Sequence, residues 1–534
     1  MNLTHHDRTR MSPCICALAL LLMAAPAVAR QPESIPSVLG HIRAAVGYER
    51  IAKHPTGIEI NGTASFCGIP SSYWLMFSGD RSIIQRVEGP ITTTSAIDGE
   101  TVWSTDIGGE TRRCQYADRE SNELGLIVLN YAYLGPQSTL VFADDPAEST
   151  GKFLALSFTQ RSGLVTGTVM IDRSTYLPEL WTYHVGTTTI TMQLGDYRDF
   201  QGIKLPGVTR TAGENDAEIT TRIDTIVDAP TFVKSPYQFV ATAFTDTSFE
   251  ASAPAGVEVV KAPTGHVLVH PLINGKDRGW FIFDTGAGNS VLSTPVISEL
   301  ELETFGAIPA KGVGGVTNAS FCRPDTLQLG SITMHKPLMV GIDLSFLEQY
   351  MGRKIAGLVG YNLLARSVVK IDMVTPAISL YSPETFKEPG LPWQNLIIDQ
   401  RLPHVEGRFE DHTGLFRLDT GAAGMSISIH APVVAKYKLL EGRETTDSQS
   451  GGVGGMVAVK KGKLAWLELG GKRMEKVDAE FATESVGVFA DPYVLGNVGG
   501  ELLNPFILVT DYPHDKIAFL ARPEAHSEAP TTEK

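Results

Sequence analysis

The apolar residues of this chain recur in short runs in which apolar and polar positions alternate. Between residues 31 and 235, a helix-like segment at 35–51 is followed by strand-like runs that include 73–77, 153–158 and 187–194. Glycine, aspartate and proline separate these runs, as is typical of strands joined by turns. The pattern predicts a helix at 35–51 and then a series of consecutive antiparallel strands.

Composition supports a strand-rich protein and excludes two classes of partner. The 534 residues include 52 glycines, and 59 acidic residues outnumber 45 basic ones, which gives a formal net charge of -14. A nucleic-acid binder or a polybasic membrane-surface protein needs a cationic face, so both are disfavoured. The chain is long enough for two to four domains, and a hydrophobic content of 43% is sufficient for their cores.

The N-terminus has the features of a secretory signal peptide over residues 1–29. Arg8 and Arg10 precede an apolar run at 15–25, and small residues follow at 27–29. The run is too short to span a membrane, and Ala-x-Ala is a typical cleavage sequence. We predict cleavage after Ala29 and a periplasmic or secreted protein without a transmembrane segment. A buried N-terminal helix and a lipoprotein are weaker alternatives.

Export affects how the remaining cysteines are interpreted, because an oxidising compartment permits disulfides. Cys67, Cys114 and Cys322 follow the predicted cleavage site. Whether Cys67 and Cys114 form a disulfide stays open, whereas Cys322 is predicted to be a lone buried thiol because no histidine accompanies it at motif spacing. The sequence holds no Cys-x-x-Cys or Cys/His cluster. We therefore expect neither a metal nor a cofactor.

An internal repeat occupies the second half of the chain. Both copies run from an apolar strand into Asp-Thr-Gly-Ala, and the two aspartates, Asp284 and Asp419, are 135 residues apart. The landmarks that recur after them in the same order are Gly-rich runs at 312–315 and 452–455, strand-turn segments at 327–330 and 467–470, and apolar-apolar-Gly blocks ending at Gly360 and Gly496. This order predicts two related lobes. The predicted divisions are a domain at 30–240, a linker at 241–256, lobes at 257–385 and 386–522, and a disordered tail at 523–534.

The repeated Asp-Thr-Gly suits acid-base hydrolysis. An apolar strand carries each Asp into a partly buried position, Gly permits a tight backbone, and the Thr hydroxyl can brace the loop. Two facing carboxyls share one proton, so that one can activate a water while the other polarises a scissile carbonyl. We predict Asp284 and Asp419 as the catalytic pair, without assigning the two roles. The predicted loop supports are Thr285, Gly286, Thr420 and Gly421.

These motifs resemble the retropepsin-like aspartic proteases, especially the bacterial periplasmic aspartyl protease family proteins, over residues 255–522. The resemblance rests on the two Asp-Thr-Gly-Ala sequences and on the blocks 358–360 and 494–496. It implies a pseudo-dimer of β lobes, paired within one chain or across two, whose Gly-rich flaps close over a peptide or protein substrate. The flap residues that it implies are Gly312, Gly314, Gly315, Gly452, Gly454 and Gly455. The second active-site loop is one residue longer than the first, and neither flap tip has an aromatic residue.

The N-terminal domain resembles, more loosely, the periplasmic lipoprotein-carrier half-barrels. The residues that carry this resemblance are Asp98-Gly99 with Trp103, Asp172-Arg173 with Pro178, and Asp196-Tyr197-Arg198 followed by 202–206. The resemblance implies a curved antiparallel sheet and a helix that bind a lipid or hydrophobic ligand, or a domain that covers the protease cleft. Alternatively, these are ordinary strand and turn residues.

The leading hypothesis is an exported aspartic endopeptidase with a mainly β fold, in which an antiparallel half-barrel-like domain precedes the two lobes. The alternative is a non-catalytic periplasmic binding protein with a protease-like fold, whose N-terminal domain binds a lipid or hydrophobic peptide. In a third, weaker hypothesis both aspartates are ion-paired turn residues, although no Arg or Lys recurs at matching offsets. Hydrogen-bonding contact between the carboxyls of Asp284 and Asp419 would favour the first hypothesis.

Overall fold

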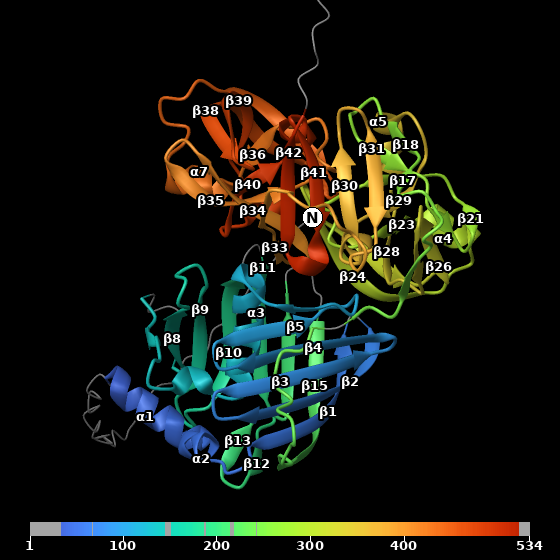
Figure 1. Ribbon diagram of the computed structural model, residues 1–534. Coiled ribbons are helices and arrows are strands. Elements are labelled where there is room, and N and C mark those ends of the chain that lie inside the picture. Colours follow the sequence, from blue (N-terminus) through green and yellow to red (C-terminus); the bar gives the residue numbers. More distant parts are fainter. Residues whose placement is uncertain are drawn as a thin grey trace, which may run out of the picture.

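The computed structural model describes residues 34–66, 68–144, 151–185, 188–213, 218–241 and 243–522. The predicted signal peptide, Cys67 and the predicted tail at 523–534 lie outside these residues. Strands predominate among the described elements, so the prediction of a mainly β fold is confirmed. Figure 1 shows an N-terminal sheet domain, in blue to green, beneath two β lobes that lie side by side.

A large antiparallel sheet forms the N-terminal domain. Its strands are β1 (Ile58–Phe66), β2 (Ile69–Ser78), β3 (Arg81–Glu88), β4 (Ile91–Asp98), β5 (Thr101–Thr105), β6 (Thr111–Arg113), β7 (Val141–Phe142), β8 (Phe153–Thr159), β9 (Thr166–Asp172), β10 (Pro178–Val185), β11 (Thr188–Gly195), β14 (Val208–Ala212) and β15 (Glu218–Asp228), and β12 (Arg198–Phe200) and β13 (Ile203–Leu205) form a separate hairpin. The order across the sheet is β6-β5-β4-β3-β2-β1-β15-β14-β11-β10-β9-β8-β7. Most neighbours are therefore consecutive strands, as predicted.

Helices cover one face of this sheet. The predicted helix at 35–51 is two helices, α1 (Ile35–Val46) and α2 (Tyr48–Ala52), because Gly47 between them adopts a φ of 75°. A side chain at Gly47 would collide with the backbone of Gly202, so this position requires glycine. The prediction lacks α3 (Tyr116–Leu129), which packs with α1 and the sheet in one buried cluster and precedes the short helix η1 (Ala132–Leu134). No helix among the described residues is long and apolar enough to cross a membrane.

The first lobe contains two sheets of its own. Its elements are β16 (Thr247–Phe249), β17 (Gly256–Val257), β18 (Val259–Lys261), β19 (Val267–Val269), β20 (Leu272–Ile273), β21 (Lys276–Asp277), β22 (Trp280–Phe283), β23 (Val291–Ser293), α4 (Thr294–Glu299), β24 (Thr304–Gly312), β25 (Gly315–Cys322), β26 (Thr326–Leu329), β27 (Ile332–His335), β28 (Met339–Ile342), α5 (Ser345–Met351), β29 (Ile355–Val359), α6 (Tyr361–Leu364), β30 (Val368–Asp372) and β31 (Ala377–Tyr381). The segment 241–256, predicted to be a linker, contains β16, which pairs with β27. Part of this segment therefore belongs to a sheet of the first lobe.

The second lobe repeats the strand order of the first. Its elements are β32 (Trp393–Asn395), β33 (Ile397–Asp399), β34 (Leu402–Phe409), β35 (His412–Leu418), β36 (Ile427–Ile429), α7 (Ala431–Lys436), β37 (Thr446–Gly452), β38 (Gly455–Leu469), β39 (Lys472–Ala482), η2 (Gly487–Ala490), β40 (Val494–Val498), α8 (Gly500–Leu503), β41 (Phe506–Asp511), η3 (Tyr512–His514) and β42 (Lys516–Ala521). One eight-stranded sheet has the order β18-β19-β22-β29-β23-β28-β25-β24, and the other has β33-β34-β35-β40-β36-β39-β38-β37. Each strand of one sheet thus has a counterpart at the same place in the other.

The strand register corrects one part of the predicted repeat. The residue before each motif Asp is paired with Val359 in the first lobe and with Val498 in the second. Gly360 therefore corresponds to Gly499, and the alignment of Gly360 with Gly496 is wrong. The second lobe is longer here, since Gly499 follows Asp419 by 80 residues whereas Gly360 follows Asp284 by 76. The sequence at 494–496 is also apolar-apolar-Gly, and it lies three residues before the true counterpart at 497–499.

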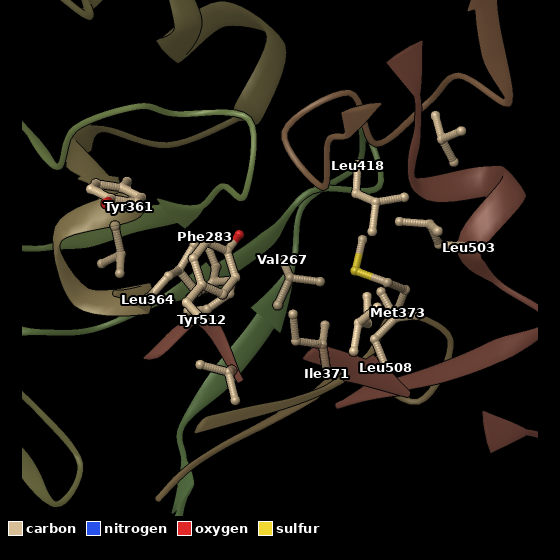
Figure 2. Packing of buried hydrophobic residues seen from close by; sticks show 14 of the residues in the cluster. Val267, Phe283, Tyr361, Leu364, Ile371, Met373, Leu418, Leu503, Leu508 and Tyr512 are labelled. Carbon is tan, nitrogen blue, oxygen red and sulfur yellow. The ribbon is translucent and has the colours of Figure 1, made fainter. Parts of the chain in front are cut away.

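A shared sheet and a shared core join the two lobes. Three strands from each lobe form a six-stranded sheet with the order β17-β31-β30-β41-β42-β32, in which β30 and β41 are antiparallel neighbours. Figure 2 shows buried side chains from both lobes packed together, with Phe283 of the first lobe beside Tyr512 of the second. The lobes consequently share one hydrophobic core.

Candidate active site

The two motif aspartates begin equivalent loops. Strand β22 leads into Asp284 and strand β35 leads into Asp419. The backbone N–H of Asp284 donates to the Val359 carbonyl and that of Asp419 donates to the Val498 carbonyl, both at 2.9 Å. Each Asp is therefore anchored to the neighbouring parallel strand of its own lobe.

The two motif threonines bind the opposite loop reciprocally. The Thr285 hydroxyl donates to the Leu418 carbonyl at 2.8 Å, and the Thr420 hydroxyl donates to the Phe283 carbonyl at 3.0 Å. Each hydroxyl also accepts from the backbone N–H of the other threonine at 3.0 Å. Both threonines are buried. These four bonds fix the position of one loop against the other.

The two motif glycines let the carboxyl groups approach each other. A side chain at Gly286 would overlap the carboxylate of Asp419, and a side chain at Gly421 would overlap that of Asp284. Each carboxyl group therefore lies against the backbone of the opposite loop, close to its counterpart. Burial, followed by repulsion from Asp419, raises the pKa of Asp284 well above its usual range, while bonds from the backbone of Gly286 and Gly421 partly oppose this shift. The structure thus brings the two aspartates predicted as the catalytic pair close together.

The sequence analysis missed two polar side chains at this site. The Asn497 side-chain amide donates to Oδ2 of Asp419 at 2.7 Å. His266 Nε2 lies 2.7 Å from the Gly421 carbonyl, and its Nδ1 lies 2.7 Å from the Thr264 hydroxyl. Burial lowers the pKa of His266, and its Nε2–H donates to the Gly421 carbonyl, because a carbonyl oxygen can only accept. Correct alignment of the repeat would have placed Asn497 beside the dyad, whereas nothing in the sequence signals the cross-lobe contact of His266.

Two Gly-rich hairpins meet at their tips. The hairpin of β24 and β25 and the hairpin of β37 and β38 carry the six glycines predicted for flaps, namely Gly312, Gly314, Gly315, Gly452, Gly454 and Gly455. The Gly314 N–H donates to the Val453 carbonyl at 3.0 Å. A side chain at Gly314 would overlap the backbone of Gly455. The hairpin tips therefore fit together only because these positions lack side chains.

The N-terminal domain contacts both lobes. The hydroxyl of Tyr361, which follows the Gly360 loop, donates to Glu110 at 2.5 Å. On the other lobe, Asp118 at the start of α3 accepts from the backbone N–H of Gln400 at 2.7 Å. Ile69 at the start of β2 belongs to the same buried cluster as residues of β25 in the first hairpin. The domain is thus attached beside one active-site loop and at the base of one hairpin.

Cysteine thiols and clusters of metal-binding side chains could also carry chemistry, as nucleophiles or as metal sites. Cys114 and Cys322 are free and buried, and burial raises the pKa of each thiol to about 12. Cys322 is therefore an unreactive buried thiol, as predicted. Among the described residues no group of three or more His, Cys, Asp or Glu side chains could hold a metal ion.

Comparison with known proteins gives one sequence family and several distant structures. The aspartyl protease family profile matches twice, at residues 269–363 and 405–497. A search of curated proteins found no match. An aspartic proteinase from Irpex lacteus covers 51% of this chain and 98% of its own at 12% identity, with a TM-score of 0.32. A LolA superfamily protein from Nitrosomonas europaea covers 39% of this chain and 99% of its own at 12% identity, with a TM-score of 0.29. The basic 7S globulin of soybean covers 50% and 94%, respectively, at 12% identity and a TM-score of 0.30.

Proposed function

We propose that the chain is an aspartic endopeptidase that hydrolyses peptide bonds of a peptide or protein substrate, with Asp284 and Asp419 as its catalytic pair. One observation carries the proposal, namely the close approach of the two carboxyl groups inside a frame of reciprocal threonine bonds. The double match to the aspartyl protease family supports it, because each match contains one of the two aspartates.

The chemistry would proceed through a water held between the two carboxyls. The ionised carboxylate takes a proton from the water, whose oxygen attacks the scissile carbonyl carbon. The protonated carboxyl donates to the carbonyl oxygen and stabilises the tetrahedral intermediate. Neither a covalent enzyme intermediate nor a metal is required in this sequence of steps. The two Gly-rich hairpins would act as flaps, and their contact would have to open for a substrate to enter.

The raised pKa of Asp284 determines the direction of the pH dependence. The pair must hold exactly one proton, so activity is expected to fall as the pH rises through the raised pKa of Asp284. Activity is also expected to fall at low pH, where both carboxyls become protonated. We therefore expect a bell-shaped profile.

The test is cleavage of an unfolded peptide library by the full chain and by two single variants, Asp284→Asn and Asp419→Asn. Each variant is expected to lose at least a hundredfold in kcat/KM, the usual scale for loss of an acid-base group. Asp325→Asn is the matched control, because Asp325 is exposed and precedes a threonine but no glycine follows. Full activity in either dyad variant would refute the shared-pair mechanism, and unfolding curves would show whether each variant is folded.

Export is a separate part of the proposal. We propose that residues 1–29 are removed as a signal peptide and that the enzyme acts in the periplasm or outside the cell. Expression of the full chain in a bacterium, followed by fractionation and intact mass measurement, tests this. A protein that keeps residues 1–29 and stays in the cytoplasm would contradict it.

A second candidate function is ligand binding by the N-terminal domain, because the domain contains a cavity. The cavity has a volume of about 210 Å³ and lies between the sheet and α3, with Leu75, Leu126 and Met192 among its apolar lining residues. Arg86 also lines it, and its buried Nε has no hydrogen-bond partner in the described structure. Apolar side chains line this cavity together with hydroxyl groups and one cationic group, which suits the end of a lipid or hydrophobic peptide that carries a negative charge.

Lipid analysis of the purified protein separates the two functions. A bound amphiphile that survives purification and disappears in Leu126→Trp, which would fill the cavity, would support binding. The same ligand should remain in Asp284→Asn, because that residue belongs to the first lobe. A ligand that is unaffected by Leu126→Trp would show that this cavity is not its site.

A further inference from the structure

The two dyad aspartates have different neighbours. In the first lobe, Leu358 is paired with Ile282 on the strand that precedes Asp284. In the second lobe, the corresponding pair is Asn497 and Arg417. The equivalent position on the third strand is Val291 in the first lobe and Ser428 in the second. The aliphatic side chains behind Asp284 are thus replaced by polar side chains behind Asp419.

Asn497 is the member of this polar group that touches the dyad. It is only 3% exposed, and its amide nitrogen lies 2.7 Å from Oδ2 of Asp419. Asp419 also accepts from the backbone N–H of Ala422 at 3.1 Å, much as Asp284 accepts from that of Gly286 at 2.8 Å. Asp284 is bonded from the backbone of Gly286 and Gly421, whereas Asp419 has one backbone donor and the Asn497 amide. Of the two aspartates, Asp419 is the one with a side-chain amide donor.

A buried amide donor stabilises an ionised carboxylate more than a neutral carboxyl. Hydrogen bonds with one charged partner are shorter and roughly twice as strong as neutral ones. A donor that bonds the charged form lowers the pKa of that carboxyl relative to its partner. Asp284 has Leu358 at the equivalent place, which offers no hydrogen bond.

Other charged or titratable groups near the pair do not reverse this difference. The Arg417 guanidinium donates to Asp491 at 2.8 Å, so its charge is largely offset. His266 bonds the Gly421 carbonyl, and burial lowers the pKa of its imidazole; a charge on this ring would also favour the ionised form of Asp419. Tyr512 packs beside Tyr361 of the first lobe, and burial raises the pKa of its phenol well above the usual range, so it carries no charge. The amide of Asn497 is therefore the main asymmetric contact.

We infer that Asn497 is a positioning residue that keeps the negative charge of the pair on Asp419 and its proton on Asp284. The inference rests on the proposed peptidase function and assigns the two roles within it. Asp419 takes a proton from the attacking water as the C–O bond forms, and Asp284 gives its proton to the carbonyl oxygen. When the C–N bond breaks, Asp419 passes its proton to the leaving amine and Asp284 regains one from the intermediate.

The test compares pH profiles of kcat/KM for the wild type and for Asn497→Leu, which installs the residue of the first lobe. Loss of the donor should move the acidic limb of the profile to higher pH by about one unit, the shift that corresponds to one hydrogen bond to a charged group. The alkaline limb should move much less, because Asp419 is ionised on both sides of it. On the acidic limb this shift means a roughly tenfold loss of kcat/KM at fixed pH. Ser428→Ala is the control, because Ser428 lies beside Asn497 but makes no bond to the dyad. An unchanged profile in an active, folded Asn497→Leu would overturn the inference.

A titration that needs no turnover keeps this test separate from the test of function. Aspartate labelled with ¹³C at Cγ reports the protonation of each dyad carboxyl, and Asp284→Asn and Asp419→Asn assign the two signals. The inference expects that Asp419 loses its proton at a lower pH than Asp284 in the wild type. It also expects that the pH of this first ionisation is higher in Asn497→Leu. If Asp284 ionises first, the inference is wrong even when peptide is cleaved. If Asn497→Leu does not fold, the isosteric Asn497→Asp takes its place. It should likewise move the acidic limb of the pH profile to higher pH.

Discussion

Replacing Thr285 with valine should weaken the junction between the lobes by about 2–4 kcal/mol. Valine keeps the shape of the side chain but removes a bond to the Leu418 carbonyl at 2.8 Å and a bond from the Thr420 N–H at 3.0 Å. Each bond contributes roughly 1 kcal/mol net, and a buried group left without a partner costs about 1–3 kcal/mol. Thr285 is only 3% exposed, so water cannot easily replace the lost partner.

The assay is urea unfolding followed by tryptophan fluorescence, carried out in the Asp284→Asn background so that self-cleavage cannot interfere. A loss of this size is a large share of the usual 5–15 kcal/mol stability of a domain, so the midpoint should move clearly. Thr420→Val should have a similar effect, because its hydroxyl makes the mirror-image pair of bonds. The control is Thr413→Val, on the exposed face of β35, where we expect a change within about 0.5 kcal/mol.

The result that would refute this reasoning is a Thr285→Val protein with unchanged stability. The reciprocal bonds would then hold the loops in place without holding the lobes together. A destabilised Thr285→Val accompanied by an equally destabilised Thr413→Val would also refute it, because the effect would then come from replacing threonine by valine in general.

Three further predictions concern the hairpin tips and the attachment of the N-terminal domain. Gly314→Val should reduce peptide cleavage at least tenfold, because a side chain there overlaps Gly455 and keeps the two hairpin tips from meeting over a substrate; normal turnover would contradict this. Burial raises the pKa of Asp118 and, together with repulsion between the two carboxyls, that of Asp399. Because the docked state then binds more protons, docking should weaken as the pH rises from about 4 toward these raised pKa values, and hydrogen exchange in α3 should lose this pH dependence in Asp118→Asn. Arg366→Met removes a bond to the Asp246 carboxylate and a bond to the Gly108 carbonyl, which lies in the β5–β6 turn. Hydrogen exchange at that turn should therefore increase severalfold, and an unchanged rate would argue against this contact.

Much of the fold was predictable because strand burial alternates along the sequence. In β1, Ile58 and Ile60 are buried while Glu59 and Asn61 are partly exposed, which is the period that indicates a half-buried strand. The helix α3 was not predictable in this way. Its buried face includes Glu120, whose carboxylate accepts a hydrogen bond from Tyr493 of the second lobe, so a tertiary contact interrupts the apolar pattern.

The candidate site was predictable only where its chemistry repeats. Asp284 and Asp419 were visible because the same motif occurs twice, but Asn497 was not, because the second lobe contains a false match three residues before the true one. His266 reaches Gly421 only after the two lobes have come together. Contacts made across a lobe boundary leave no local pattern, so the sequence reveals the reacting groups more readily than the groups that orient them.

The shared six-stranded sheet cannot form until the last strands of the chain have been synthesised. Strand β30 pairs with β41, whose first residue, Phe506, follows Asp284 by 222 residues. At a synthesis rate of about 5–20 residues per second, roughly 10–45 s separate the appearance of Asp284 from that of β41. During this interval the second lobe, which carries Asp419, is incomplete. A ribosome-bound chain would therefore be unable to cleave its own unfolded segments, and hydrolytic competence would arise only after the second lobe had been made.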